Sequence, residues 1–356
     1  MTEPLVQGST IGILGGGQLG RMLSVAASRL GFKTHIYEPA ANAPASQVAH
    51  HTTTAAYDDE DALTGFAEAV DIITFEFENI PTAALDLLEQ LRPIRPNRRT
   101  LAISQDRLSE KQFLQDLGLA TAPFAAVGTL VDLQTALAGL GTPAILKTRR
   151  FGYDGKGQVR LNTANEPAIA LAGLQGAPAI LEGFVEFSLE ISVIAARSLE
   201  GSITAYDPGE NLHRDGILRT TTVPARLSGT QRTDAILLAA KILNALDYVG
   251  VLGVELFVTP QNLIVNEIAP RVHNSGHWTQ NGCAVDQFEQ HIRAIAGWPL
   301  GDGTRHSDVE MENLIGDDIV RIPALAKQTN TAIHLYGKGE VRPGRKMGHV
   351  NRIGTA

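Results

Sequence analysis

Hydrophobic and polar residues follow two alternating patterns in the first hundred residues. Short apolar runs at residues 10–14, 34–37 and 71–75 predict buried strands. The pattern at residues 21–30 predicts a helix that ends at Gly31, and residues 15–20 predict a turn before it. Strands that alternate with helices are typical of parallel βαβ units. The proline-containing stretch at residues 91–97 interrupts the pattern and is the first predicted domain boundary.

The rest of the chain has fewer helical patterns and more apolar runs. Residues 107–117 and 285–296 predict helices, and residues 144–148, 179–181, 190–196, 251–258 and 263–268 predict strands. The last fifty or so residues consist of short, polar, Gly-rich segments, which predict a small β-rich closing domain. We therefore expect an α/β chain, α+β overall, with domains at residues 1–103, 104–300 and 301–356.

Two glutamates interrupt the last pair of apolar runs. Because a turn-like segment separates the runs, they predict an antiparallel hairpin, and a loop at residues 260–262 would place Glu255 directly opposite Glu267. Like charges repel in such a pair. A divalent metal would supply the missing positive charge, and Asn266 offers a further oxygen. The alternative is two carboxylates that face solvent at a sheet edge or pair with arginines.

Composition and charge narrow the class of protein. The 356 residues carry a net charge of −8, which argues against a general nucleic-acid binder. The chain has one cysteine, Cys283, so an intramolecular disulfide cannot form and a cytoplasmic location is expected. No apolar run approaches the length of a membrane helix, and residues 1–10 lack the pattern of a signal peptide. These features favour a soluble enzyme over a structural protein.

The first Gly-rich segment has two interpretations. Residues 15–20 match G-x-G-x-x-G between a predicted strand and a predicted helix, and Glu38 follows where a ribose-binding acid would lie. These features favour a dinucleotide-binding domain and, with it, an NAD-dependent dehydrogenase. Gly-rich turns also bind other phosphates or only allow close packing.

A second Gly-rich segment follows Lys147 at the end of a predicted strand. Residues 151–158, FGYDGKGQ, contain three glycines and Lys156, which suits a mobile flap whose N–H groups surround phosphate oxygens. The G-K-[ST] signature of a Walker A loop is absent. The alternative is an ordinary turn with solvated lysines.

Three further segments carry candidate binding groups. The apolar strand that leads into residues 182–185, EGFV, is suited to pairing with an adenine edge, and Glu190 is suited to a ribose hydroxyl. Residues 270–277, PRVHNSGH, gather many hydrogen-bond donors in a short loop, which favours a functional role over a purely structural one. A zinc site at its two histidines lacks a third histidine or a cysteine. Residues 342–349, RPGRKMGH, form a basic turn that suits a phosphate monoester or a solvated surface.

The order of these segments resembles the ATP-grasp superfamily over nearly the whole chain. Within it, GGGQLGRM at residues 15–22, TFEFENIP at residues 74–81 and RPGRKMGH at residues 342–349 resemble the N5-carboxyaminoimidazole ribonucleotide synthetase family. The segments at residues 151–158 and 270–277 fit the same family. The resemblance implies an ATP-grasp fold with an N-terminal Rossmann-like pre-ATP-grasp domain and a small C-terminal β-rich domain.

The resemblance also implies a reaction. Bicarbonate attacks the γ-phosphate of ATP to give carboxyphosphate and ADP, and the amine of 5-aminoimidazole ribonucleotide is then carboxylated, a step of de novo purine synthesis. ATP, bicarbonate and this ribonucleotide are the implied partners, with two Mg²⁺ ions held by Glu255 and Glu267. The resemblance also implies a homodimer, and it implies no nucleic-acid partner and no membrane partner.

Residue roles transfer by matching to the family pattern. The implied ATP-binding residues are Arg107, Lys147, Gly152, Tyr153, Asp154, Gly155, Lys156, Gly157, Gln158, Glu182, Gly183, Phe184, Val185, Glu190, His213, Asn266 and Glu267. The implied residues for the ribonucleotide and carboxyphosphate are Gly17, Gln18, Leu19, Glu76, His273, Asn274, Ser275, Arg345, Lys346 and Arg352. Arg271, Asp154 and Tyr153 are the implied catalytic residues.

Three other hypotheses compete with this one. A different ATP-grasp enzyme of purine synthesis, such as a formate-dependent glycinamide ribonucleotide transformylase, would use the same ATP site. An NAD-dependent dehydrogenase would use residues 15–20 and Glu38. An inactive binding scaffold is disfavoured because both carboxylates and the phosphate-binding lysines are present.

Overall fold

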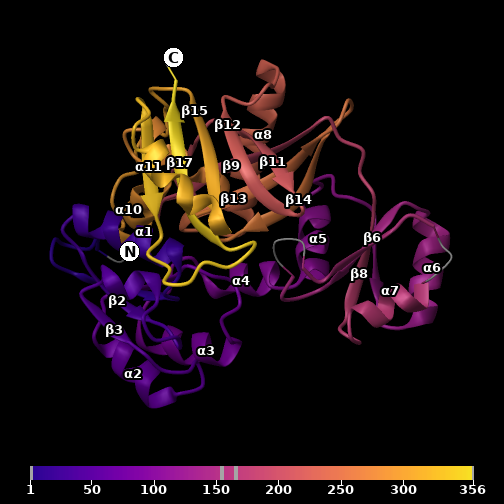
Figure 1. The fold of residues 1–356 in the computed structure, drawn as a ribbon. Helices are drawn as coiled ribbons and strands as arrows, with labels where there is room; N and C mark the ends of the chain where they lie inside the picture. Colours follow the sequence, from indigo (N-terminus) through magenta and orange to yellow (C-terminus); the bar gives the residue numbers. More distant parts are fainter. Residues whose placement is uncertain (1–2, 153–155, 164–166, 355–356) are drawn as a thin grey trace.

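The computed structural model describes residues 3–152, 156–163 and 167–354, and it contains three β-sheets flanked by helices (Figure 1). The four-stranded sheet A contains the N-terminal strands, which are indigo in Figure 1. The nine-stranded sheet B contains the orange and yellow strands, and the four-stranded sheet C lies to one side of it. The mixed helix and sheet content that the sequence predicts is confirmed.

Sheet A is parallel throughout, with strand order β3-β2-β1-β4. Its strands are β1 (Thr10–Leu14), β2 (Lys33–Tyr37), β3 (His51–Thr53) and β4 (Ile72–Phe75). Its helices are α1 (Gln18–Arg29), the 3₁₀ helix η1 (Pro44–Gln47), α2 (Glu60–Glu68) and α3 (Thr82–Leu91). The predicted βαβ pattern is confirmed, but α1 begins at Gln18, inside the segment that the sequence predicts as a turn. Two short helices, α4 (Arg98–Ser104) and α5 (Arg107–Asp116), then lead away from sheet A.

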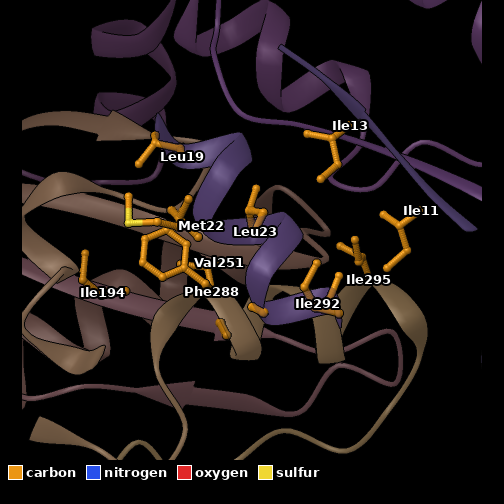
Figure 2. Close-up of a cluster of buried hydrophobic side chains, with 14 of the residues drawn as sticks. Ile11, Ile13, Leu19, Met22, Leu23, Ile194, Val251, Phe288, Ile292 and Ile295 are labelled. Carbon is orange, nitrogen blue, oxygen red and sulfur yellow. The ribbon is translucent and has the colours of Figure 1, made fainter. Parts of the chain in front are cut away.

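A buried hydrophobic cluster joins sheet A to sheet B (Figure 2). Leu23 of α1 and Ile11 of β1 are fully buried there, as are Val251 and Ile292 from the second half of the chain. Burial of a side chain of this size contributes about 1.5–3 kcal/mol, so this interface holds the N-terminal unit firmly against sheet B. The loops that follow β1 and β4 are thereby held beside the large sheet.

Sheet C is antiparallel, with strand order β5-β8-β6-β7. Its strands are β5 (Phe124–Val127), β6 (Ala144–Thr148), β7 (Gln158–Leu161) and β8 (Ala179–Gly183). Helices α6 (Leu130–Leu140) and α7 (Pro167–Gly173) cover it, and a separate hydrophobic cluster lies between them and the strands. Sheet C is therefore a small unit with its own core, on the far right in Figure 1.

Sheet B forms the centre of the molecule, with strand order β14-β13-β9-β11-β12-β15-β17-β16 and β10 beside β9. Its strands are β9 (Leu189–Arg197), β10 (Ile203–Ala205), β11 (Gly209–Arg214), β12 (Ile217–Val223), β13 (Gly250–Val258), β14 (Leu263–Ala269), β15 (Val309–Ile315), β16 (Thr331–Leu335) and β17 (Lys346–Ile353). Its helices are α8 (Gly229–Ala245), η2 (Asn274–Gly276), α9 (Thr279–Gly282), α10 (Gln287–Ala296), η3 (Gly316–Arg321) and α11 (Ile322–Leu325).

The C-terminal strands extend sheet B and do not form a sheet of their own. β15 pairs with β12 on one side and with β17 on the other. The predicted boundary at residue 300 therefore precedes strands that join the large sheet, and the division into three domains stays a prediction. In the part of the chain that the structure describes, no helix has the length and apolar character to span a membrane.

Candidate active site

A cavity of about 590 Å³ lies where elements of the three sheets meet. Sheet A contributes the turn after β1 and the segment after β4, sheet C contributes β6 and the start of β7, and sheet B contributes β9, β11, β12, β13, β14 and β17. The sequence-predicted residues that line it are Gly17, Gln18, Leu19, Glu76, Arg107, Lys147, Gly152, Lys156, Gln158, Glu190, His213, Glu255, Asn266, Glu267, Arg271, His273, Asn274 and Lys346. Most of the predicted site residues are thus brought together from distant parts of the sequence.

The β13–β14 hairpin places Glu255 opposite Glu267, as predicted, but the loop between the strands differs from the predicted one. Val258 pairs with Leu263, so the loop has four residues and not three, which alone would shift the pairing by one position. A β-bulge between Leu256 and Glu255 compensates and restores the Glu255–Glu267 pair. The extra residue is Asn266. Consecutive strand residues normally face opposite sides, and a bulge changes this. Asn266 and Glu267 accordingly both line the cavity.

The two carboxylates have opposite electrostatic environments. Burial and the nearby charge of Glu267 raise the pKa of Glu255 to about 7. Burial also opposes ionisation of Glu267, but Arg107 outweighs it and lowers the pKa of Glu267 to about 2. An Arg107 Nη1 atom lies 3.0 Å from Glu267 Oε2. At neutral pH the negative charge of the pair is therefore concentrated on Glu267, next to the guanidinium.

Lys147 enters the cavity from β6 and is held by a buried carboxylate. Its Nζ atom donates to Glu182 Oε2 at 2.9 Å, and Lys111 Nζ lies 3.5 Å from the same oxygen. Burial opposes ionisation of Glu182, but the two lysines outweigh it and lower its pKa. The Glu182 side chain is thus bound inside the protein and does not line the cavity.

The second Gly-rich segment begins at the wall of the cavity. Arg107 Nη2 donates to the carbonyl of Gly152 at 3.3 Å, and Gly152, Lys156 and Gln158 line the cavity. Gly157 has a φ of +69°, a conformation that favours glycine, and its carbonyl accepts from the Thr148 N–H at 2.8 Å. Tyr153, Asp154 and Gly155 lie outside the described residues.

Glu190 of β9 and His213 of β11 form a hydrogen-bonded pair at the cavity wall. Glu190 Oε2 and His213 Nδ1 are 2.5 Å apart. Burial disfavours the charged imidazole, but the bond to Glu190 and the charge of Glu255 outweigh burial, so the pKa of His213 is raised. The pair offers both an acceptor and a donor to a polar ligand.

In the first Gly-rich turn, internal carboxylates bind the backbone N–H groups. The Gly16 N–H donates to Glu38 Oε2 at 2.7 Å, and the N–H groups of Gly17 and Gly20 donate to the two oxygens of Glu76 at 2.9 and 3.2 Å. A dinucleotide pyrophosphate would need these same donors. Three N–H groups of the turn are therefore already bonded to carboxylates, which disfavours the dinucleotide hypothesis, and Glu38 is engaged by the turn itself.

Arg271 and His273 lie between this turn and the hairpin carboxylates. Arg271 Nη2 is 2.8 Å from Glu78 Oε1, and His273 Nε2 is 3.6 Å from Glu255 Oε1. Burial and the charge of Arg271 lower the pKa of His273 to about 3, so its imidazole is neutral at physiological pH. Ser275 Oγ lies 2.8 Å from His273 Nδ1. Ser275 is fully buried and supports His273 from behind the cavity wall.

Several other predicted residues do not line the cavity. The N–H groups of Gly183 and Phe184 donate to Pro123 and Pro143 carbonyls, so these donors are used within sheet C. Phe184 stacks under the guanidinium of Arg160.

The remaining predicted residues away from the cavity wall are Gly157, Val185, Arg345 and Arg352. Arg345 Nη1 donates to the Glu340 carbonyl at 2.9 Å, and Arg352 pairs with Glu310 and Glu312 at 3.1 and 2.8 Å. Their predicted ligand roles stay predictions.

The structure also identifies site residues that the sequence reasoning missed. Glu78 and Glu110 line the cavity, and Lys111 lies behind it. Glu78 was detectable, because in the run FEFE at residues 75–78 the two glutamates alternate with phenylalanines, as on one face of a strand. Glu110 and Lys111 gave no signal, since charged residues in a helix usually face solvent.

The hairpin carboxylates fit a magnesium site. Among the described residues, no group of three or more acidic, histidine or cysteine side chains is arranged to hold a metal. Magnesium, however, is usually bound by one or two carboxylates together with substrate phosphates and water. Glu255, Glu267 and the amide of Asn266 supply such an oxygen set, and Lys147 lines the same cavity.

Three family models match successive parts of the chain. A ribonucleotide synthetase preATP-grasp domain matches residues 8–105, an ATP-grasp domain matches residues 112–288, and a phosphoribosylaminoimidazole carboxylase C-terminal domain matches residues 310–356. Fold and models together define an ATP-grasp ligase with its preATP-grasp and C-terminal domains.

Comparison with individual proteins shows which family of ATP-grasp ligases the chain is most similar to among those compared. The chain is 56% identical to an N5-carboxyaminoimidazole ribonucleotide synthase of Brucella melitensis over 98% of this chain and 97% of that protein. It resembles the N5-carboxyaminoimidazole synthetase of Staphylococcus aureus solved with ADP, with a TM-score of 0.95, 36% identity and coverage of 100% and 95%. The Aspergillus clavatus enzyme solved with ADP and 5-aminoimidazole ribonucleotide gives a TM-score of 0.92, 32% identity and coverage of 98% and 94%.

The chain belongs to the N5-carboxyaminoimidazole ribonucleotide synthase family. The resemblance inferred from the sequence is thereby confirmed, as is the ATP-grasp fold. The transformylase and dehydrogenase alternatives gain no support from these relatives.

Proposed function

We propose that the protein carboxylates 5-aminoimidazole ribonucleotide with ATP and bicarbonate, a step of purine synthesis. A bicarbonate oxygen bonds to the γ-phosphorus as the bond to the β,γ-bridging oxygen breaks, which gives carboxyphosphate and ADP. The amine nitrogen then bonds to the carboxyl carbon, phosphate leaves and the nitrogen loses a proton. The observation that carries the proposal is the convergence of the phosphate-side Lys147, the hairpin carboxylates and the C-terminal Lys346 on one cavity.

The ATP side of the cavity has groups for phosphate and nucleoside. Lys147 and Lys156 bring positive charge to the phosphates from sheet C, and Arg107 brings it from α5. The Glu190–His213 pair suits ribose hydroxyl groups. Phosphoryl transfer depends mainly on positioning and electrostatic stabilisation, which these charges provide.

Two magnesium ions would be held by Glu255 and Glu267, with Asn266 as a further oxygen donor. When bound, the ions would neutralise charge on the transferred phosphoryl group. The protein's own contribution is to keep Glu267 ionised through Arg107 and to hold both carboxylates on facing strands.

The acceptor side is built by sheet A and the C-terminal strands. Lys338 Nζ donates to Gln18 Oε1 at 2.5 Å and to the Lys346 carbonyl at 2.7 Å, so one side chain connects the start of α1 to β17, although Lys338 and Gln18 are 320 residues apart in the sequence. Lys346 would bind the 5′-phosphate, with Arg345 and Arg352 as further candidates. Arg271 and the neutral His273 would hold bicarbonate and carboxyphosphate, and Tyr153 and Asp154 would border the imidazole.

Two wider features belong to the same proposal. We infer that the protein acts as a homodimer in the cytoplasm. Sedimentation equilibrium would test the dimer, and a single species of monomer mass at assay concentrations would contradict it.

An ADP-release assay tests the function. With Mg²⁺ and ATP present, bicarbonate and 5-aminoimidazole ribonucleotide together should stimulate ADP release, and omission of either should remove the stimulation. Formate with glycinamide ribonucleotide serves as the matched alternative. Stimulation by the formate pair only, or no stimulation under conditions in which a relative is active, would reject the proposal.

A further inference from the structure

Two neighbouring ionisable side chains of α5, Glu110 and Lys111, bond to the backbone on either side of Glu267. Lys111 Nζ donates to the Asn266 carbonyl at 2.8 Å. The Ile268 N–H donates to Glu110 Oε1 at 2.6 Å. Consecutive residues of one helix thus form hydrogen bonds with the β-bulge of β14 from outside the sheet. This helix lies beside β14 in Figure 1.

The position of β14 explains why such partners are needed. β14 is the edge strand of sheet B, so backbone groups on its outer side have no strand to pair with. A bulge also leaves its extra residue outside the regular ladder. Next to the bulge, the Val265 N–H donates to the Ala120 carbonyl at 2.8 Å, an ordinary backbone partner. At the bulge itself, side chains take this role.

Glu110 and Lys111 are ionisable side chains that are almost completely buried. Glu110 is 2% exposed and Lys111 is 1% exposed. Buried charges lose their hydration, and replacement of a buried ion pair by well-packed apolar side chains is often neutral or stabilising. Apolar residues at these positions would cover the strand edge but would leave the Asn266 carbonyl and the Ile268 N–H without partners.

Lys111 also reaches the phosphate side of the cavity. Its Nζ atom lies 3.5 Å from Glu182 Oε2, and that oxygen accepts from Lys147 at 2.9 Å. One ammonium group therefore contacts both the bulge and the carboxylate that orients Lys147. This chain of contacts connects sheet B to sheet C through α5.

We propose that Glu110 and Lys111 are positioning residues, which hold the bulge so that Asn266 and Glu267 both face the cavity, and that Lys111 ties this arrangement to Lys147 through Glu182. The inference rests on the proposed function for the role of Glu267 as a metal ligand. It assigns neither residue a contact with substrate.

A pair of variants at position 110 separates shape from charge. Glu110→Gln retains an acceptor oxygen for the Ile268 N–H, and Glu110→Met removes it at similar volume. Hydrogen exchange of the Ile268 amide should accelerate more than about tenfold in Glu110→Met and remain close to the unmodified protein in Glu110→Gln. Mn²⁺ binding in the presence of ADP, followed by electron paramagnetic resonance, should weaken about 10–100-fold in Glu110→Met, as for other residues that support metal ligands.

Leu114→Ala is the matched control on the same helix. Leu114 is fully buried one turn after Glu110 and packs in the hydrophobic cluster of sheet B. Its truncation should lower the melting temperature without changing Mn²⁺ affinity or the exchange of the Ile268 amide relative to Val265. If Glu110→Met does not fold, Lys111→Met carries the Mn²⁺ test, because it removes the donor to the Asn266 carbonyl while Glu182 keeps Lys147 as its partner.

Each outcome decides the proposal. Unchanged Ile268 exchange in Glu110→Met, or unchanged Mn²⁺ affinity in the methionine variants, would overturn it. Equal losses in Glu110→Gln and Glu110→Met would assign the effect to charge, and an equal loss in Leu114→Ala would assign it to helix stability; both would also overturn it. If the unmodified protein binds Mn²⁺ with ADP but does not turn over, the proposed function fails and the positioning role is still tested. If the unmodified protein does not bind Mn²⁺, the comparison of Ile268 exchange between Glu110→Met and Glu110→Gln decides whether Glu110 holds the bulge.

Discussion

In the Gly-rich turn after β1, backbone N–H groups donate to the carboxylates of Glu38 and Glu76, whereas in the β13–β14 hairpin two carboxylates face the cavity. Both regions depend on a charged side chain that satisfies irregular backbone. In the turn this occupies three N–H groups that a phosphate could otherwise bind. At the bulge, the partners come from α5 at the outer edge of β14, and Asn266 and Glu267 still line the cavity. A Gly-rich pattern is therefore weaker evidence for a phosphate site where internal carboxylates bond its N–H groups.

The largest expected effect comes from the hairpin. Glu267→Gln keeps the shape but removes the charge next to Arg107, and ADP release should fall by at least about 10²-fold. The fold should persist, since repulsion with Glu255 is relieved. The assay is bicarbonate-dependent ADP release with circular dichroism of the same sample.

Glu210→Gln is the control for that variant, because Glu210 lies on the same sheet, pairs with Arg226 and does not line the cavity. It should keep near-normal turnover. Normal turnover in Glu267→Gln would remove the metal role assigned to that residue.

In the turn, Glu76→Gln should have a smaller and different effect. It leaves one acceptor oxygen for the N–H groups of Gly17 and Gly20, and the amide group that replaces the second oxygen is a donor. We expect a loss of about 1–3 kcal/mol in the free energy of unfolding. The KM for 5-aminoimidazole ribonucleotide should rise about tenfold while the KM for ATP stays constant. If only the KM for ATP changed, Glu76 would act on the ATP side of the cavity, which would contradict this prediction.

A pair of glycine variants tests how closely the turn is packed. A β-carbon at Gly17 would lie 2.7 Å from Glu76 Oε1, so Gly17→Ala should destabilise the fold by about 1–3 kcal/mol. Gly65 lies in α2 with open space around it, and Gly65→Ala should stabilise by about 0.5–1 kcal/mol. Chemical denaturation measures both. Equal effects of one sign would contradict this packing.

The smallest expected effect is the pH dependence of the Glu190–His213 pair. Because the pKa of His213 is raised in the folded state, its contribution to stability is full below about pH 6.5 and declines as pH rises through the folded pKa. The difference in unfolding free energy between the protein and His213→Gln should therefore shrink from acid to alkaline pH, within about 1 kcal/mol. A difference that grows with pH would show that the imidazole is held neutral.

The sequence predicted the strands of the hairpin and the Glu255–Glu267 pair, but not the reason for the pairing. The loop is one residue longer than expected, and the bulge at Asn266 corrects the register. A bulge has no clear signature in one sequence. In retrospect the signal was the adjacent polar pair Asn266–Glu267, since strict alternation would bury one of them.

Residues that act through distant partners were less predictable. Glu182 was expected to contact adenosine, yet its carboxylate binds Lys147 and Lys111. The contacts of Glu110 and Lys111 reach more than a hundred residues along the chain, to β14. Local patterns report which face of an element is apolar and cannot report which buried charge meets which backbone group. The extension of sheet B by the C-terminal strands was missed for the same reason.

The continuous sheet B has a mechanical consequence. Glu267, Glu255, Glu190, His213 and Lys346 are all carried by its strands, so a change in the spacing between the metal-side and acceptor-side groups would break strand pairing. Lys147 comes from sheet C, which has its own core and no strand in sheet B. Sheet B thus sets the distance between the metal-side and acceptor-side groups, and the position of Lys147 relative to them depends on side-chain contacts such as those of Glu182.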